Sequence, residues 1–375
     1  MTTAVASSPI RVLVVDDSAF MRMAISRMIA SDPELRVVGT AAGGIEALAM
    51  IPGIDPNVIT LDVQMPGIDG LETLRRIMTH FPRPVIMVSA VTEDGATATF
   101  DALALGAFDY VPKRLSAGSL NIHHIQQDLT TKIKAAAQSR RARGHLDDGK
   151  KAPSTAQRHA HFVSHPNPAI IAIGASTGGP KALEEILPVL PRELPVPILI
   201  VQHMPVGFTT PFAERLDKLC KISVQEAIDS EPLRAGMVYI APAGFHMRIQ
   251  RSVDARTVIS LSDKNEDRPH VPSVDIMMQS VALAFGSESM GIIMTGMGTD
   301  GAQGMNAIHR AGGFTVGQDE PTCTVYGMPR ACAELGILDR TVPLAQIPLE
   351  ILEATRYREP VRTTKVERTT HATLP

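Results

Sequence analysis

The sequence predicts an α/β protein with two domains, each built on a parallel β-sheet. The chain has 375 residues, which is long for one hydrophobic core and suits two domains of about 100 to 200 residues each. Short apolar segments alternate with helical segments, a pattern typical of parallel sheets covered by helices on both faces. The alternation stops in a polar stretch near the middle of the chain and then resumes. A repeated β/α pattern with one interruption therefore indicates two separate α/β units.

The first unit, residues 9–128, contains five predicted strands. They are RVLVV at 11–15, LRVVGT at 35–40, NVITL at 57–61, PVIMVSA at 84–90 and FDYV at 108–111. Helical stretches such as AFMRMAISRMIA at 19–30 and GLETLRRIMTHF at 70–81 separate the strands. We expect a five-stranded parallel sheet here.

The second unit follows a stretch of charged and polar residues. Residues 129–167 are poor in apolar residues, so we predict a flexible linker there. Predicted elements then return over residues 168–358, which we expect to form a doubly wound α/β domain. Their segments are AIIAIGAS at 169–176, VPILIVQHM at 196–204, GMVYIAPAG at 236–244, TVISLS at 257–262, GIIMTGMG at 291–298 and LGILDRTVPL at 335–344. Residues 359–375 read as a loose polar tail.

Composition and charge limit the classes of function. The formal net charge is −3 with Lys and Arg dispersed along the chain, so we expect no nucleic-acid partner. No apolar run approaches the roughly 18 residues of a membrane span, so we expect no membrane insertion. The cysteines Cys220, Cys323 and Cys332 are odd in number and show no CxxC spacing, which predicts neither a disulfide framework nor a zinc site. The reduced cytoplasm is the expected location.

Acidic residues follow two of the predicted strands in the first unit. Asp16 and Asp17 come directly after RVLVV, and Asp62 follows NVITL. Ligands of parallel sheets collect at the carboxyl ends of the strands, so these carboxylates should converge. A hard divalent cation such as Mg²⁺ would offset their mutual repulsion. Ser89 and Lys113 follow the next strands and add a hydroxyl and an ammonium suited to phosphoryl oxygens.

With these residues in place, the first 125 or so positions resemble a two-component receiver domain, which has a flavodoxin-like fold. The motifs that carry the resemblance are VVDDS, TLDVQMPGIDG, VSA and FDYVPK. The resemblance implies phosphorylation by a histidine kinase with Mg²⁺ as cofactor. It assigns Asp62 as the phospho-acceptor, Asp16, Asp17, Asp62 and the Gln64 carbonyl as metal ligands, and Ser89, Tyr110 and Lys113 as the switch. Receivers usually have a proline after the lysine, whereas this chain has Arg114, so we expect a trans peptide bond there.

A serine in the second unit lies in a glycine-rich turn. The segment GASTGG at 174–179 lacks the lysine that a GxxxxGK[ST] phosphate loop needs after Gly179. The same residues match G-x-S-x-G, the turn that exposes a nucleophilic serine, here Ser176. Such a serine needs a base and an orienting carboxylate. His203 ends the next predicted strand, and Asp300 follows a later one.

Other histidines are rival bases, and chain order separates this site from a known class. The rivals are His246, His270 and His309; His309 lies in a helical pattern and His246 follows APAG, so neither of these two directly follows a predicted strand. The order serine, histidine, aspartate differs from the α/β-hydrolases, where the acid precedes the histidine. We therefore expect Ser176, His203 and Asp300 to form a separately built triad.

Residues 168–355 resemble the catalytic domain of the chemotaxis receptor methylesterase (CheB) family. The matching motifs are IGASTGGP, QHMPVGFT, FAERL, YIAPAG, PSVD, TGMGTDGAQGM and VYGMP, although Val271 stands where the family usually has arginine before PSVD. The resemblance implies a cofactor-free hydrolysis of glutamate γ-methyl esters on the cytoplasmic domains of chemoreceptors, with release of methanol. It assigns Ser176 as nucleophile, His203 as base, Asp300 as its orienter, and the backbone N–H groups of Thr177 and Met297 as the oxyanion hole.

Regulation and two alternatives follow from the same resemblance. An unphosphorylated receiver docked over the esterase is expected to inhibit it, and phosphorylation of Asp62 to activate it. Some members of the family also deamidate receptor glutamines, and the sequence does not separate the two activities. A phosphorylation-gated adaptor without catalysis is the alternative from another class, although an adaptor has no need of a nucleophile with its base.

Overall fold

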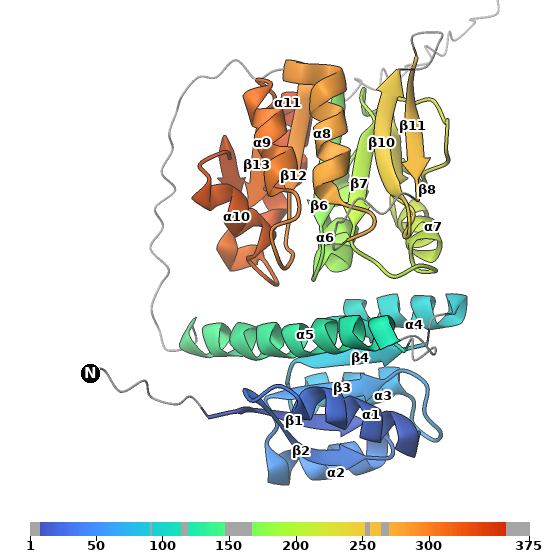
Figure 1. Cartoon of the computed structure of the whole chain (residues 1–375), viewed down its shortest axis with the longest axis vertical. Helices are drawn as coiled ribbons and strands as arrows, with labels where there is room; N and C mark the ends of the chain where they lie inside the picture. The colour runs from blue at the N-terminus through green and yellow to red at the C-terminus, as the bar shows by residue number, and fades with distance from the viewer. Residues whose placement is uncertain are drawn as a thin grey trace, which may run out of the picture.

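The computed structural model of the chain contains two α/β units stacked end to end (Figure 1). The structure describes residues 8–90, 92–113, 119–146, 167–251, 256–263 and 270–357. In this part of the chain no helix is both long enough and apolar enough to cross a membrane. Arg114, residues 147–166 and the tail at 359–375 lie outside the described residues.

The N-terminal unit is a five-stranded parallel sheet in the order β2-β1-β3-β4-β5, as the sequence predicts. This is the flavodoxin-like order, in which the order of adding strands reverses between β1 and β3. Every residue of β3 and β4 is buried because helices cover both faces. The elements are β1 (Ile10–Val15), α1 (Ala19–Ala30), β2 (Leu35–Ala41), α2 (Gly44–Ile54), β3 (Val58–Asp62), α3 (Gly70–His80), β4 (Val85–Ser89), α4 (Glu93–Ala104), β5 (Asp109–Pro112) and α5 (Ser119–Leu146).

Short polar residues set the starts of three receiver helices. The side chains of Ser18, Asp69 and Thr92 each accept a hydrogen bond from a backbone N–H in the first turn of α1, α3 and α4. These bonds satisfy donors that have no partner within the helix. The helices therefore begin immediately after the strand-end loops that carry the acidic residues.

Helix α5 corrects the predicted boundary at residue 128. Residues 129–146 were expected to begin a flexible linker, but they continue α5 to Leu146. Leu129, Ile133, Ala136 and Ala137 are buried against the strands of the receiver sheet. Their spacing of four, three and one residues forms one apolar stripe on the helix. Charged residues lie between them, so the composition of this segment does not reveal the apolar stripe.

The C-terminal unit is a seven-stranded parallel sheet in the order β14-β13-β12-β6-β7-β9-β8. The chain enters at the centre, builds one half of the sheet, and returns to build the other, which is the doubly wound arrangement. The strands are β6 (Ile170–Ala175), β7 (Ile198–Gln202), β8 (Ser223–Glu226), β9 (Met237–Ile240), β12 (Ser289–Ile293), β13 (Phe314–Gln318) and β14 (Arg340–Val342). The α-helices are α6 (Gly179–Ile186), α7 (Thr209–Leu219), α8 (Val274–Phe285), α9 (Ala302–Arg310), α10 (Met328–Glu334) and α11 (Ile347–Ala354).

A hairpin departs from the predicted β/α alternation. The segment TVISLS forms β11 (Thr257–Ser262), which pairs antiparallel with β10 (His246–Arg251) in a two-stranded sheet of its own. Strands β8, β10 and β13 were not among the predicted segments. The hairpin packs beside α8 at one edge of the domain (Figure 1).

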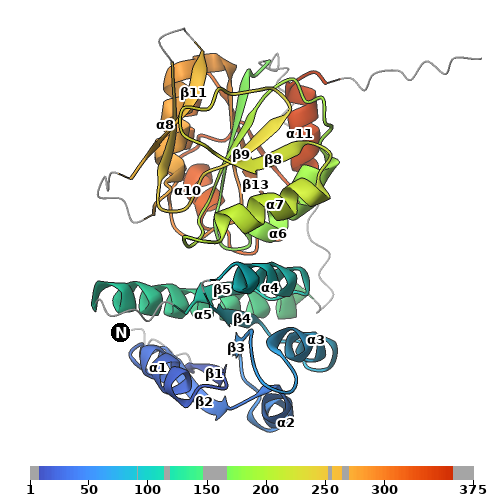
Figure 2. The same ribbon diagram turned by 90° about the vertical axis from the view of Figure 1, so that its right-hand side faces the viewer.

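Helices α4 and α5 lie between the two sheets, so the receiver contacts the second domain through them (Figures 1 and 2). Phe100 in α4 contacts Phe212 in α7, with ring centroids 5.1 Å apart. Tyr110 in β5 stacks on Phe208 at 5.0 Å and 13°. Arg215 in α7 donates to Asp101 in α4 at 2.7 Å and to Glu184 in α6 at 2.6 Å. The contact between the domains is therefore aromatic at its centre, with one charged bridge.

Candidate active site

Ser176 follows the fully buried strand β6 in a turn that depends on glycine. Its backbone N–H donates to the Thr295 carbonyl at 3.1 Å, which ties the turn to the loop after β12. Gly178 has φ of +79°, and an added Cβ would lie 2.4 Å from Thr324. At Gly179 an added Cβ would lie 1.9 Å from the Gln202 side chain. Glycine is therefore needed at position 178 for its positive φ and at position 179 for close packing.

The structure brings His203 and Asp300 together, as predicted. His203 follows β7, and Asp300 lies in the turn after β12. His203 Nε2 lies 2.8 Å from Asp300 Oδ2. Strands β12, β6 and β7 are neighbours, and the order in which strands are added to the sheet reverses between β12 and β6. This reversal is where doubly wound sheets place their ligand sites.

The Asp300 carboxylate is held by several donors. It accepts hydrogen bonds from Ser273 Oγ at 2.8 Å, from the Val274 backbone N–H at 2.8 Å and from the Asp275 backbone N–H at 3.1 Å. Burial disfavours the charged form, but the hydrogen bond from His203, the charge of that ring and the backbone donors outweigh it and hold the pKa of Asp300 well below its usual range. Asp300 is thus an anion throughout the neutral range.

The other nitrogen of His203 is available for proton transfer. Nδ1 is buried and has no hydrogen-bond partner in the described chain. The Ser176 hydroxyl likewise forms no hydrogen bond among these residues, and both side chains line one cavity of about 660 Å³. Because Nε2 faces the carboxylate, we assign the proton to Nε2 and the free lone pair to Nδ1. Nδ1 is therefore the atom that can act as base toward Ser176.

The two predicted oxyanion donors lie in the same cavity. Thr177 and Met297 both line it, and neither backbone N–H donates a hydrogen bond within the described residues. The loop after β12 approaches the serine closely, since an added Cβ on Gly296 would lie 2.9 Å from Ser176 Cβ. Two unpaired N–H groups beside a serine are suited to a developing oxyanion. Their role in this chain stays a prediction.

The three rival histidines lie in different surroundings. His270 stacks on His203, with ring centroids 4.1 Å apart and 17° between the planes. His270 is exposed as a whole residue, but its ring is packed among neighbouring atoms. This burial of the ring, together with the charge of His203, lowers the pKa of His270 to about 4, so the ring is neutral at pH 7. His246 is buried, and its Nδ1 accepts from the Ser273 backbone N–H at 3.2 Å. His309 lies in α9, 3.9 Å from Asp339. Of the three, the structure places His270 against the His203 ring.

The opposite wall of this cavity belongs to the receiver. Its receiver residues include Asp109, Tyr110, Gln127, Asp128, Thr131 and Lys132. The sequence does not predict these residues as part of the site, because nothing in either domain alone shows how the two dock. The candidate active site is thus built by both domains.

The predicted receiver site is also assembled. Carboxylate oxygens of Asp16, Asp17 and Asp62 lie within 4.8 Å of one another. Lys113 Nζ lies 2.9 Å from Asp16 Oδ2 and 2.6 Å from Asp62 Oδ2. Burial raises the pKa of Asp62, and the contact with Lys113 only partly offsets this. Ser89 Oγ donates to the Gly95 carbonyl at 3.0 Å.

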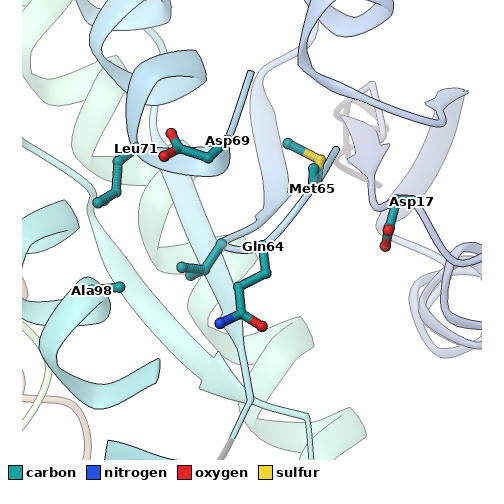
Figure 3. A pocket seen from close by; sticks show the side chains of 7 residues that line it. Asp17, Gln64, Met65, Asp69, Leu71 and Ala98 are labelled. Carbon is teal, nitrogen blue, oxygen red and sulfur yellow. The ribbon is translucent and has the colours of Figure 1, made fainter. Parts of the chain in front are cut away.

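A cavity of about 470 Å³ opens beside the acidic cluster (Figure 3). Asp17 and Gln64 line it together with Met65 and Asp69. The Gln64 backbone N–H lies 3.3 Å from Asp62 Oδ1, which fixes the loop next to the acidic cluster. Of the three clustered carboxylates, Asp17 lines this cavity.

Comparison with known proteins shows which families the two domains match. Residues 171–351 match the family model CheB methylesterase, and residues 12–124 match the response regulator receiver domain. A protein-glutamate methylesterase/protein-glutamine glutaminase from Nitratidesulfovibrio vulgaris is 44% identical over 363 residues, which cover 92% of this chain and 98% of that protein. One from Pyrococcus horikoshii is 45% identical over 347 residues, covering 92% and 93%.

The chain belongs to the CheB methylesterase family. The segment that matches the CheB model contains Ser176, His203 and Asp300, and the receiver match contains Asp62. Among solved structures, the CheB methylesterase catalytic domain of Thermotoga maritima is similar, with 38% identity and a TM-score of 0.48 over 50% of this chain and 98% of that one. The response regulator domain of Thermotoga maritima CheB is 45% identical, with a TM-score of 0.32 over 35% and 97%.

Proposed function

We propose that the protein hydrolyses glutamate γ-methyl esters on the cytoplasmic domains of chemoreceptors and that phosphorylation of its receiver activates it. The observation that carries the proposal is the pairing of His203 Nε2 with Asp300, which leaves Nδ1 free in the cavity that Ser176 lines. The family membership supports the same reaction class.

The reaction divides into acylation and deacylation. Ser176 Oγ attacks the ester carbonyl while His203 Nδ1 takes its proton, and Asp300 stabilises the imidazolium that forms. The N–H groups of Thr177 and Met297 donate to the oxyanion. His203 then protonates the leaving methoxide, and methanol departs. Water, deprotonated by His203, releases the glutamate carboxylate from Ser176.

The same residues can act on a glutamine amide, with ammonia as the leaving group. The printed names of the relatives include protein-glutamine glutaminase, so glutamine deamidation is the second candidate activity. The intermediate on Ser176 would be the same acyl ester. The two activities differ in which leaving group His203 must protonate.

Receiver control rests on the contact between the domains. The receiver closes one side of the cavity that holds Ser176, so a receptor-sized substrate cannot enter while the domains stay docked. A phosphoryl group on Asp62 would attract Ser89 and Lys113, and Tyr110, which stacks on Phe208, would carry the change to the interface. A histidine kinase is the expected phosphoryl donor.

The acidic cluster fits Mg²⁺. The donor set consists of the carboxylates of Asp16, Asp17 and Asp62, which are hard oxygen ligands gathered in one place. These residues, with the Gln64 carbonyl, would hold the ion. Bound Mg²⁺ supplies positive charge that offsets the phosphoryl oxygens. Lys113 Nζ, which lies 2.6 Å from Asp62 Oδ2, would contact the same oxygens.

Methanol release from methylated receptor fragments tests the proposal. We expect acetyl phosphate with Mg²⁺ to raise the rate for the intact protein, and Asp62→Asn or chelation with EDTA to remove the stimulation while leaving the basal rate. Measuring ammonia from glutamine-containing fragments in parallel separates the two activities. Release of neither product in any state would contradict the assignment, and plain receptor binding would then favour the adaptor.

The Arg215 bridge predicts a smaller effect on inhibition. Asp101→Asn removes the negative charge and therefore the ion pair across the interface, but leaves Arg215 paired with Glu184. Because the pair is partly exposed, we expect its loss to weaken docking by about 0.2–1 kcal/mol, which raises the basal methanol rate up to about 5-fold. Glu72→Gln in α3 removes ion pairs within the receiver and serves as the matched control. A basal rate that rises equally in both variants would argue against the bridge as a docking contact.

A further inference from the structure

The imidazole ring of His203 is fixed at two points by hydrogen bonds at its two ends. At the backbone end, the His203 carbonyl accepts from Gln202 Nε2 at 3.0 Å. At the far end of the ring, Nε2 is paired with Asp300 Oδ2 at 2.8 Å. Nδ1, the atom that we assign as the base, lies off the line that joins these two ends. A tilt of the ring about this line would therefore move Nδ1 relative to Ser176 while both hydrogen bonds remain.

His270 lies flat against the His203 ring. The two ring centroids are 4.1 Å apart, and the angle between the ring planes is 17°. Aromatic rings stacked in this way attract each other and keep their planes nearly parallel. A tilt of His203 toward His270 would force the two rings together, and a tilt away from it would break the stack. His270 therefore restricts the one motion of the ring that the hydrogen bonds leave open.

The loop that carries His270 is anchored within the esterase domain. The Val271 carbonyl accepts from the Gly244 backbone N–H at 3.2 Å. Two residues further on, the Ser273 backbone N–H donates to His246 Nδ1 at 3.2 Å. None of these contacts involves the receiver, so we expect the stack to persist when the two domains separate.

The charge of His270 suits a position beside the base. Burial of its ring, together with the charge of His203, lowers the pKa of His270 to about 4, whereas Asp300 acts in the opposite direction and Lys132 adds to the lowering. A ring that is neutral at pH 7 does not repel the imidazolium that forms on His203 during acylation. In the described part of the chain no carboxylate pairs with His270, so it lacks the orienting partner that His203 has in Asp300.

We propose that His270 is a positioning residue for the base: its ring holds the plane of His203, so that Nδ1 stays directed at Ser176. The proposal rests on the proposed function, in which Nδ1 takes the proton of the serine. His270 also lines the cavity, where proton transfer or a contact with the substrate would be other roles for it. Positioning requires only a flat ring, whereas proton transfer requires a ring nitrogen and a substrate contact acts on KM.

Methanol release by the full-length, phosphorylated protein tests this role. His270→Ala removes the ring, and we expect kcat to fall about 10-fold or more, since a displacement of about 1 Å at a catalytic group can cost on the order of 10²-fold. KM should stay close to the wild-type value. His270→Phe keeps a flat ring without nitrogens and should restore most of kcat. His309→Ala is the matched control, because His309 lies in α9 and is not among the residues that line the cavity.

The same measurements without acetyl phosphate separate positioning from docking. The receiver shares this cavity, so a change at His270 could also alter how tightly the receiver covers it. Altered docking would change the ratio of the phosphorylated to the unphosphorylated rate. A tilted His203 ring lowers both rates by the same factor. We therefore expect the ratio in His270→Ala to equal that of the wild type.

The remaining outcomes would overturn the positioning role. A wild-type kcat in His270→Ala would show that the stack is not needed. Equal losses in the alanine and phenylalanine variants would show that the imidazole itself is used, and a raised KM with unchanged kcat would show a substrate contact. Labelling of Ser176 by a fluorophosphonate probe keeps the nucleophile separate from this result. If the wild type labels, any failure concerns His270 alone; if it neither labels nor releases methanol, the esterase assignment falls and the role of His270 with it.

Discussion

Ser176→Ala is expected to lower kcat for methanol release by on the order of 10⁶-fold, the loss seen when a triad serine is removed. In this chain His203 Nδ1 and the N–H groups of Thr177 and Met297 all lie around the cavity that Ser176 lines. Alanine leaves these groups in place but removes the atom that forms the acyl intermediate. Methanol release under single-turnover and steady-state conditions, with the phosphorylated protein, measures the effect.

Thr177→Ala is the matched control for this variant. It removes a neighbouring hydroxyl but keeps the backbone N–H that we assign to the oxyanion hole. The Thr177 variant should retain most of the activity, and both variants should keep the wild-type melting temperature within a few degrees. Methanol release from Ser176→Ala at a rate close to the wild type would show that another group is the nucleophile.

Asp300→Asn should lower kcat by about 10⁴-fold while the fold remains intact. The carboxylate accepts from His203, from Ser273 and from two backbone N–H groups, so each oxygen faces donors only. An asparagine amide would direct N–H hydrogens at one of these donor groups. It would also favour the His203 tautomer with the proton on Nδ1, which cannot accept the proton of Ser176. A pH–rate profile and steady-state kinetics of the variant measure this change.

The depressed pKa of Asp300 also gives the sign of a pH effect. A carboxyl group whose pKa is lower in the folded state than in the unfolded chain adds stability above its unfolded pKa, and this contribution is lost as pH falls through the folded value. Asp300 thus stays ionised across the neutral range because its pKa lies well below the usual range. Ser273→Ala, which removes one donor and leaves the carboxylate, should cost far less than Asp300→Asn. Equal losses in the two variants would contradict the role given to Asp300.

Much of the site could be predicted because its residues lie at strand ends. Ser176, His203 and Asp300 each follow a strong apolar segment, and in a parallel sheet such positions converge whatever the details of packing. The same holds for Asp16, Asp17 and Asp62. The positions of these residues in the sequence were sufficient to predict that they converge, because a parallel sheet brings the carboxyl ends of its strands to one edge.

Other features depended on tertiary contacts that no local pattern records. The stacking of His270 on His203 requires the loop before α8 to fold back over β7. Gln127 joins the cavity only because the two domains dock. Residues 129–146 read as polar linker because their buried stripe consists partly of alanines, which carry little apolar signal. Strand β8 has only four residues, of which Val224 alone is apolar, so it carries too little apolar signal to be predicted.

The stacking of Tyr110 on Phe208 couples the two domains in both directions. Tyr110 belongs to the predicted receiver switch, and Phe208 precedes α7 of the esterase. If phosphorylation weakens this contact, then thermodynamic linkage requires the contact to weaken phosphorylation by the same free energy. The esterase domain would then be an effector of its own receiver, and a receptor that draws the domains apart would favour the phosphorylated state. Substrate and phosphate would then bind cooperatively to one molecule.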